Sequence, residues 1–120
     1  MSYSIILGVT GSIAAYKAVE VVSSLTKQGN HVTVIMTSNA QRFVHPVTFQ
    51  SISKNRVITD LFIDTGNYDP NHISLAEDAD IVIVAPATAN FIGKVVSGIA
   101  DDALTCTVMA ARSTVIIAPA

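Results

Sequence analysis

Four short runs of apolar and β-branched residues recur along this chain, each separated from the next by a segment with helical or turn-forming character. The runs cover residues 5–7, 31–37, 80–85 and 113–118. Continuous apolar runs of this length are typical of strands buried on both faces, and such strands occur in parallel sheets. Because the strands alternate with helical segments, the sequence predicts an α/β fold built on a parallel sheet.

The segments between these strands carry helix signals. Spacings of three and four after the first strand predict the buried face of a helix, formed by Ala14, Ala18, Val21, Val22 and Leu25. We expect Ser12 to cap this helix and Gly29 to follow its end. A weakly helical stretch broken by Pro46 is expected over 39–53, and a loop over 64–71. Further helices are expected over 72–79 with Asn71 as its cap, over 90–97, and from Asp101 or Asp102 to about Arg112.

Length and composition exclude several classes of protein. A chain of 120 residues is expected to form one domain, and with half of its residues hydrophobic and 13% charged it is not intrinsically disordered. A net charge of −2 without a Lys/Arg-rich run argues against nucleic-acid and membrane partners. The apolar start is too short for a signal peptide or membrane span, and the single cysteine forms no internal disulfide. We therefore expect a cytoplasmic protein.

The turn over residues 8–13 joins the first strand to the first helix. It lacks both the Gly-x-Gly-x-x-Gly spacing and the lysine of a Walker loop. Small residues here would still let backbone N–H groups approach a phosphate, although an ordinary tight turn explains them equally well. The second strand ends at Thr37 and Ser38 without the carboxylate that usually binds the ribose of NAD, which argues against NAD and leaves a mononucleotide such as FMN open.

The stretch 85–94 is the most distinctive in the chain. It combines a strand end, Pro86, small residues, Thr88 and Asn90. Small residues permit the close approach of a flat ring, and the Asn90 amide could bind the polar edge of a flavin. A loop followed by a helix that starts at Thr88 accounts for the same residues, and the chemistry alone does not separate these two interpretations.

The titratable residues give weaker signals. Asp101 and Asp102 are adjacent and do not face each other on a helix, so capping is favoured over acid–base catalysis. His72 lies at an expected helix start and is a candidate general base, whereas His31 and His45 suggest no task. Cys106, inside an expected helix, is interpreted as a buried structural thiol. Histidine and cysteine never occur at metal-ligand spacing, so no metal site is expected.

Four motifs together carry a family resemblance. The segments Gly-Ser-Ile-Ala-Ala-Tyr-Lys at 11–17, Asn-His-Ile-Ser-Leu at 71–75, Pro-Ala-Thr-Ala-Asn at 86–90, and Lys-x-x-x-Gly-Ile-Ala-Asp-Asp at 94–102 occur in order. Their order and spacing resemble the homo-oligomeric flavin-containing cysteine decarboxylases, closest to those that act on phosphopantothenoylcysteine. The resemblance covers essentially the whole chain.

The resemblance implies a Rossmann-like, flavodoxin-type three-layer sandwich that assembles into trimers or dodecamers, with FMN near a subunit boundary. It implies FMN-dependent decarboxylation of 4′-phospho-N-pantothenoylcysteine to 4′-phosphopantetheine in coenzyme A biosynthesis, with His72 as the catalytic base. The implied FMN-binding residues are Gly11, Ser12, Ile13, Ser38, Phe49, Ala87, Thr88, Ala89 and Asn90. Thr88 and Phe91 replace a serine and a threonine of the family motif.

The resemblance also bears on domain organisation. The family's substrate clamp begins with Pro-x-Met-Asn where this chain reads Pro119-Ala120, so residues 1–120 are expected to form the flavoprotein domain without that clamp. A peptidyl-cysteine decarboxylase and a flavin prenyltransferase remain as alternatives within the superfamily. A non-catalytic flavin-binding regulatory subunit and an NAD-binding module are alternatives of other classes.

Overall fold

The structure is a computed structural model that describes residues 2–62, 66–67 and 70–120. Half of the predicted loop over 64–71 falls outside these residues. The described elements are β1 (Ser4–Val9), α1 (Ala15–Lys27), β2 (His31–Met36), the 3-10 helix η1 (Ala40–Arg42), α2 (Pro46–Ser53), α3 (Asn71–Asp78), β3 (Ile81–Ala87), α4 (Ala89–Val96), α5 (Ala103–Ala110) and β4 (Thr114–Pro119).

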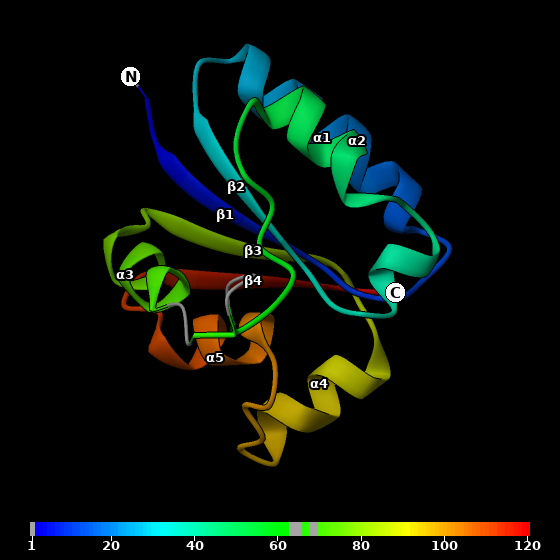
Figure 1. Cartoon of the computed structure of the whole chain (residues 1–120), viewed down its shortest axis with the longest axis vertical. Coiled ribbons are helices and arrows are strands. Elements are labelled where there is room, and N and C mark those ends of the chain that lie inside the picture. The colour runs from blue at the N-terminus through cyan, green and yellow to red at the C-terminus, as the bar shows by residue number, and fades with distance from the viewer. Residues whose placement is uncertain (1, 63–65, 68–69) are drawn as a thin grey trace.

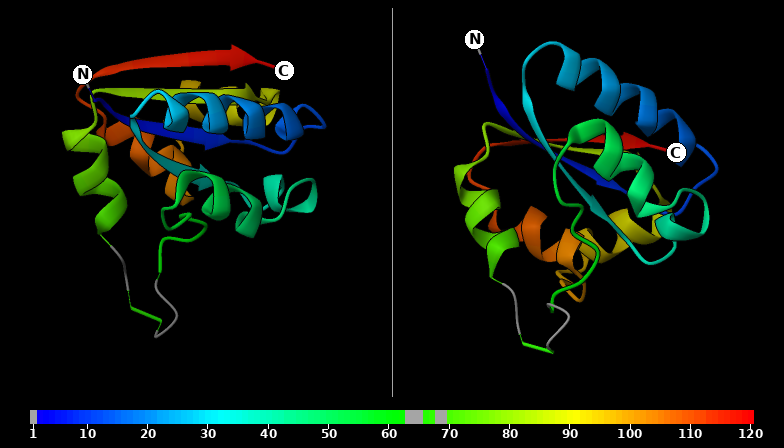
Figure 2. Two further views of the ribbon diagram at one scale, coloured as in Figure 1. Left: turned by 90° about the horizontal axis from the view of Figure 1, so that it is seen from above. Right: turned by 45° about the horizontal axis from the view of Figure 1, so that its top comes forward.

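The four strands form one parallel sheet in the order β2-β1-β3-β4. Helices α1 and α2 cover one face of this sheet, and α3, α4 and α5 lie on the other (Figures 1 and 2). The chain moves outward from β1 to β2 and then crosses back over β1 to reach β3. The predicted α/β fold with a parallel, three-layer arrangement is therefore confirmed.

Alternate residues of β1 supply the two halves of the core. Leu7 and Val9 pack with Val22 of α1 on one face of the sheet. Ile6 packs on the other face with Leu104 of α5. Gly8 points to this second face, where an added Cβ would overlap Cδ1 of Leu104. The glycine therefore allows α5 to sit directly against β1, and α5 lines the site described below.

The start and the buried face of α1 differ from the prediction. The helix begins at Ala15, and Ser12 does not occupy the cap position, although its Oγ accepts a hydrogen bond from the Ala14 N–H at 3.2 Å. The buried stripe runs through Ala15, Ala18 and Val22, and Val21 is exposed. The predicted stripe was too wide because Val21 lies one helical step of 100° away from Val22.

Two predicted boundaries were wrong for reasons of backbone chemistry. Pro46 begins α2 rather than breaking a helix, because the first helical position needs no N–H donor. The His45 Nδ1 caps α2 by accepting the Val47 N–H at 3.1 Å. Asn71 is the first residue of α3 and not its cap, a position that Pro70 takes.

The last two strands run further than expected. The strand β3 continues through Pro86 to Ala87, and its pairing with β4 shifts register between Val84 and Ala87. Proline is tolerated in a strand at such an irregularity because its missing N–H breaks no regular ladder bond. The strand β4 includes Pro119, whereas α5 ends at Ala110, before the expected Arg112.

Candidate functional site

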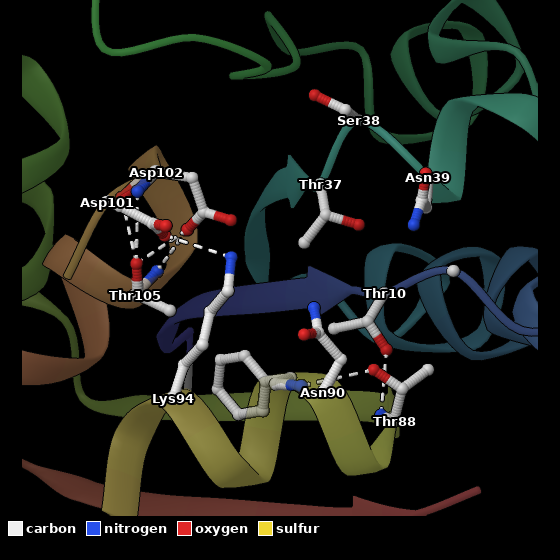
Figure 3. Close-up of a pocket in the computed structure, with 12 residues that line it drawn as sticks. Thr10, Thr37, Ser38, Asn39, Thr88, Asn90, Lys94, Asp101, Asp102 and Thr105 are labelled. Carbon is white, nitrogen blue, oxygen red and sulfur yellow. Dashed lines mark hydrogen bonds and ion pairs between the residues drawn. The ribbon is translucent and has the colours of Figure 1, made fainter. Parts of the chain in front are cut away.

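A pocket of about 350 Å³ opens at the carboxyl ends of β1, β2 and β3 (Figure 3). It is lined by residues that follow β1 and β2, by the first turns of α4, and by the start of α5. In open parallel α/β sheets this edge is where ligands bind, because the loops that follow the strands converge there. Its size lies within the range of small-molecule sites, roughly 300–1,000 Å³.

The loops after β1 and β2 form a cradle that fits an anion. Gly11 packs so tightly against Asn39 that an added Cβ would overlap the asparagine Cβ. Within the described chain, the N–H groups of Gly11 and Ile13 donate to no protein acceptor, and the Ser12 hydroxyl donates no hydrogen bond. Free N–H donors at the start of a helix bind phosphate groups, so this loop has the donors that an FMN phosphate requires.

The turn between β3 and α4 presents a second set of polar groups. Thr88 is the N-cap of α4, and its Oγ1 accepts the Phe91 N–H at 3.3 Å. The helix-start interpretation of this stretch is therefore confirmed, but it does not compete with ligand binding. Asn90, in the first turn of α4, is exposed and directs its side-chain amide into the pocket (Figure 3).

The far end of the pocket carries charged groups. The Lys94 Nζ lies 3.0 Å from the Asp101 Oδ1. The Asp102 carboxylate caps α5 by accepting the Thr105 N–H at 2.8 Å and the Thr105 hydroxyl at 2.7 Å, so capping was the right interpretation for Asp102. Both carboxylates thus have partners within the protein, and the neutral donors at the opposite end remain for a ligand.

Comparison with known proteins identifies this arrangement. The family model described as Flavoprotein matches residues 1–120. The chain belongs to this flavoprotein family. It is 51% identical over 117 residues to the coenzyme A biosynthesis bifunctional protein CoaBC of Bacillus subtilis (strain 168), covering 98% of the chain and 29% of that protein. It is 43% identical over 110 residues to the probable phosphopantothenoylcysteine decarboxylase of Streptococcus mutans, covering 92% of the chain and 62% of that protein.

Solved structures agree with the sequence comparison. The FMN-dependent cysteine decarboxylase TvaF from thioviridamide biosynthesis superposes with a TM-score of 0.91 at 31% identity, covering 98% of this flavoprotein and 73% of that chain. The crystal structure of HAL3 from Cryptococcus neoformans gives a TM-score of 0.83 at 28% identity, over 96% of this chain and 68% of that one. The predicted resemblance and the Rossmann-like fold class are therefore confirmed. The chain spans less than a third of the bifunctional relative and about three fifths of the Streptococcus protein.

The pocket brings together only part of the predicted flavin-binding set. Gly11, Ser38, Thr88 and Asn90 line it, although they come from three separate strand ends. Ser12 and Ile13 belong to the same cradle loop without lining the cavity, and Ala87 and Ala89 flank Thr88. Phe49 is fully buried in the core between α2 and the sheet, and the structure places it outside the pocket.

His72 lies apart from the pocket residues. Its side chain is 1% exposed, it sits in the first turn of α3, and it is not among the residues that line the cavity. The described pocket lining contains no histidine at all. His31 is exposed at the start of β2 and contacts Asn55, as expected of a surface histidine. The described residues also contain no cluster of three or more potential metal ligands.

In the loops that follow the strands, sequence reasoning missed two polar residues that line the pocket, Thr10 and Asn39. Each follows a strand directly or closely at its carboxyl end, and that position was the available signal. Their neighbours in the same loops, Gly11 and Ser38, were identified because they belong to recognisable motifs. Thr10 and Asn39 required the observation that loops after adjacent parallel strands meet.

The Cys106 thiol is half-buried rather than buried, and its Sγ donates to the Ala100 carbonyl oxygen at 3.4 Å. Burial raises the pKa of this thiol, and the nearby carboxylates of Asp102 and Asp101 raise it further. A thiol with a raised pKa stays protonated and is a poor nucleophile. The predicted burial of Cys106 was therefore wrong, whereas the raised pKa argues against its use as a nucleophile.

Proposed function

We propose that this chain binds FMN in the pocket at the carboxyl ends of β1–β3 and serves in the decarboxylation of phosphopantothenoylcysteine. The observation that carries the proposal is that Gly11, Ser38, Thr88 and Asn90 converge on one cavity. The family resemblance implies all four as flavin contacts. The names of the Bacillus and Streptococcus relatives supply the coenzyme A pathway and the substrate.

The loops after β1 and β2 and the turn into α4 divide the binding task between them. The N–H groups of Gly11 and Ile13 and the hydroxyls of Ser12 and Ser38 would hold the phosphate. The Asn90 amide, at the start of α4, would bind the polar edge of the ring system. When bound, FMN would supply the electron transfer that oxidises the cysteinyl side chain so that carbon dioxide can leave.

Proton removal from the substrate is assigned to His72. Because the described pocket lining contains no histidine, the proposal requires a neighbouring subunit to supply this group, with the first turn of α3 at the subunit boundary. His72 is 1% exposed in the single chain, so assembly has to uncover its ring. A trimeric or dodecameric assembly is therefore part of the proposal.

A cytoplasmic location belongs to the same proposal. The relatives named for coenzyme A biosynthesis support it, and so does the single cysteine, which suits a reducing compartment. None of the helices in the described ranges is both long and apolar enough to cross a membrane.

The first test is a titration of the full chain with FMN, riboflavin and NADH, followed by fluorescence. FMN should bind and riboflavin should bind about tenfold or more weakly, because riboflavin lacks the phosphate that the cradle loop contacts. Preference for NADH would overturn the proposal, and equal binding of riboflavin would remove the phosphate site from it.

The second test separates the two substrate classes. The FMN-loaded chain is mixed with phosphopantothenoylcysteine or with a peptide that ends in cysteine, and released carbon dioxide is measured. Release from phosphopantothenoylcysteine alone would support the proposal. Release from the peptide alone would assign the chain to peptide modification instead. Analytical ultracentrifugation of the same sample tests the trimer or dodecamer.

A further inference from the structure

Thr10 joins two loops of the pocket through a single hydroxyl group. It follows β1 directly, and its side chain is 2% exposed. The Thr10 Oγ1 donates to the Pro86 carbonyl oxygen at 2.6 Å. It also accepts the Thr88 N–H at 3.0 Å (Figure 3). The Thr10 N–H also donates to the Pro86 carbonyl oxygen at 3.3 Å. The residue after β1 is therefore bonded to both sides of Ala87, the last residue of β3, just before α4.

These hydrogen bonds hold the residue that caps α4. The backbone of Thr88 is held by Thr10, while the Thr88 side chain caps the helix by accepting the Phe91 N–H. Asn90 lies in the first turn of that helix and projects into the pocket. A shift of the Thr88 backbone would move the cap, and with it the direction of the Asn90 side chain.

Thr10 acts on a ligand through this turn rather than by direct donation. A threonine hydroxyl has one proton, and the Thr10 proton is already donated to Pro86. It therefore has no proton left for a phosphate or a flavin oxygen. The residues that remain able to contact a ligand are those that Thr10 places, Thr88 and Asn90.

We propose that Thr10 is a positioning residue for flavin binding, which orients the β3–α4 turn so that Asn90 meets the ring. This inference rests on the FMN binding proposed above. It adds a residue to which the family resemblance assigned no role, and it predicts that the hydroxyl, not the volume of the side chain, is what the pocket requires.

The test compares Thr10→Val, which keeps the shape and removes the hydroxyl, with Thr10→Ser, which keeps the hydroxyl. Thr107→Val is the matched control, because Thr107 is also fully buried and its hydroxyl donates to the Ala103 carbonyl oxygen at 2.7 Å, away from the pocket. FMN dissociation constants are measured on the full chain below the unfolding temperature of every variant. Thr10→Val should raise the dissociation constant about tenfold or more, whereas Thr10→Ser and Thr107→Val should stay within about twofold of the original chain.

A second measurement does not depend on the flavin. Hydrogen exchange at the Thr88 amide, followed by NMR, should be slow in the original chain and in Thr10→Ser, and about tenfold or more faster in Thr10→Val. If Thr10→Val does not fold, Thr10→Cys replaces it in both measurements. It differs from Thr10→Ser by one atom, and its thiol is a weak donor and acceptor.

The outcomes separate this inference from the proposed function. Failure of the original chain to bind FMN would overturn the proposed function and this inference with it. Tight FMN binding by a folded Thr10→Val chain would overturn the positioning role alone. Equal weakening in Thr10→Val and Thr107→Val would also overturn it, since the loss would then reflect general stability.

Discussion

Gly11 and Asn39 touch so closely that a Cβ on Gly11 would overlap the Cβ of Asn39. The backbone carbonyl carbon and the Cα of Asn39 would also lie 3.1 and 3.3 Å from that added atom. The loop after β1 and the loop after β2 therefore meet through backbone as well as side-chain atoms at the edge of the pocket. A side chain at position 11 cannot be accommodated by a simple rotation of its neighbour.

Gly11→Ala should open the phosphate cradle. We expect the FMN dissociation constant to rise about tenfold or more and the free energy of unfolding to fall by about 1–3 kcal/mol, because the loops must separate. Gly93→Ala is the matched control, since nothing lies within 4 Å of its added Cβ and alanine favours the helix. Fluorescence titration and urea unfolding measure both quantities. Unchanged FMN affinity in Gly11→Ala would remove this loop from the site.

Asn90→Ala should weaken FMN binding without destabilising the fold. The Asn90 side chain is exposed and makes no hydrogen bond with other described residues, and alanine is the better helix former. We expect a dissociation constant raised about tenfold and an unfolding temperature that does not fall. Ser97→Ala, at the opposite end of α4, should change neither value. If Asn90→Ala binds FMN normally, the residue serves only as part of a helix start.

His72→Asn should separate catalysis from cofactor binding. His72 does not line the pocket of its own chain and is assigned to the substrate's proton, so FMN affinity should stay within about twofold. Release of carbon dioxide should fall about 100-fold or more if His72 is the base. His31→Asn replaces an exposed histidine and should leave both properties unchanged. Full decarboxylase activity in a folded His72→Asn chain would contradict the assignment.

Cys106 should react slowly with iodoacetamide near neutral pH. Its raised pKa means less thiolate at any given pH, so the profile of alkylation rate against pH should lie at higher pH than that of a free cysteine peptide. Because folding raises this pKa, its contribution to stability is present below the pKa of the unfolded thiol and is lost as the pH rises through the folded value.

Asp101→Asn removes one of the charges that raise this pKa and leaves the Asp102 cap of α5 in place. The alkylation profile of Cys106 should then move to lower pH. Glu20→Gln, on α1 at the other face of the sheet, should not move it. A profile that matches the free peptide in the original chain would show that neither burial nor the carboxylates act on the thiol.

The sequence by itself determined the fold class and most of the elements. The runs at 31–37 and 80–85 form strands because short, β-branched apolar runs bury both of their faces well in a parallel sheet that is covered on both sides. Local chemistry also identified the Asp102 cap, which depends on groups three residues apart. The errors at Ser12, Pro46 and Asn71 all concern helix ends. The residue that caps a helix is set by the backbone conformation of one or two residues there, which the sequence pattern does not specify.

Only the tertiary structure decided which residues meet. The sequence could not pair Gly11 with Asn39 or Thr10 with Thr88, because these contacts form only after β1 takes its place between β2 and β3. For the same reason it could not distinguish Phe49, which lies in the core, from Asn90, which lines the pocket. Sequence patterns show how far apart residues are along the chain. The site instead depends on the order of the strands in the sheet, because that order brings the loops after β1, β2 and β3 together, and it is set by long-range packing.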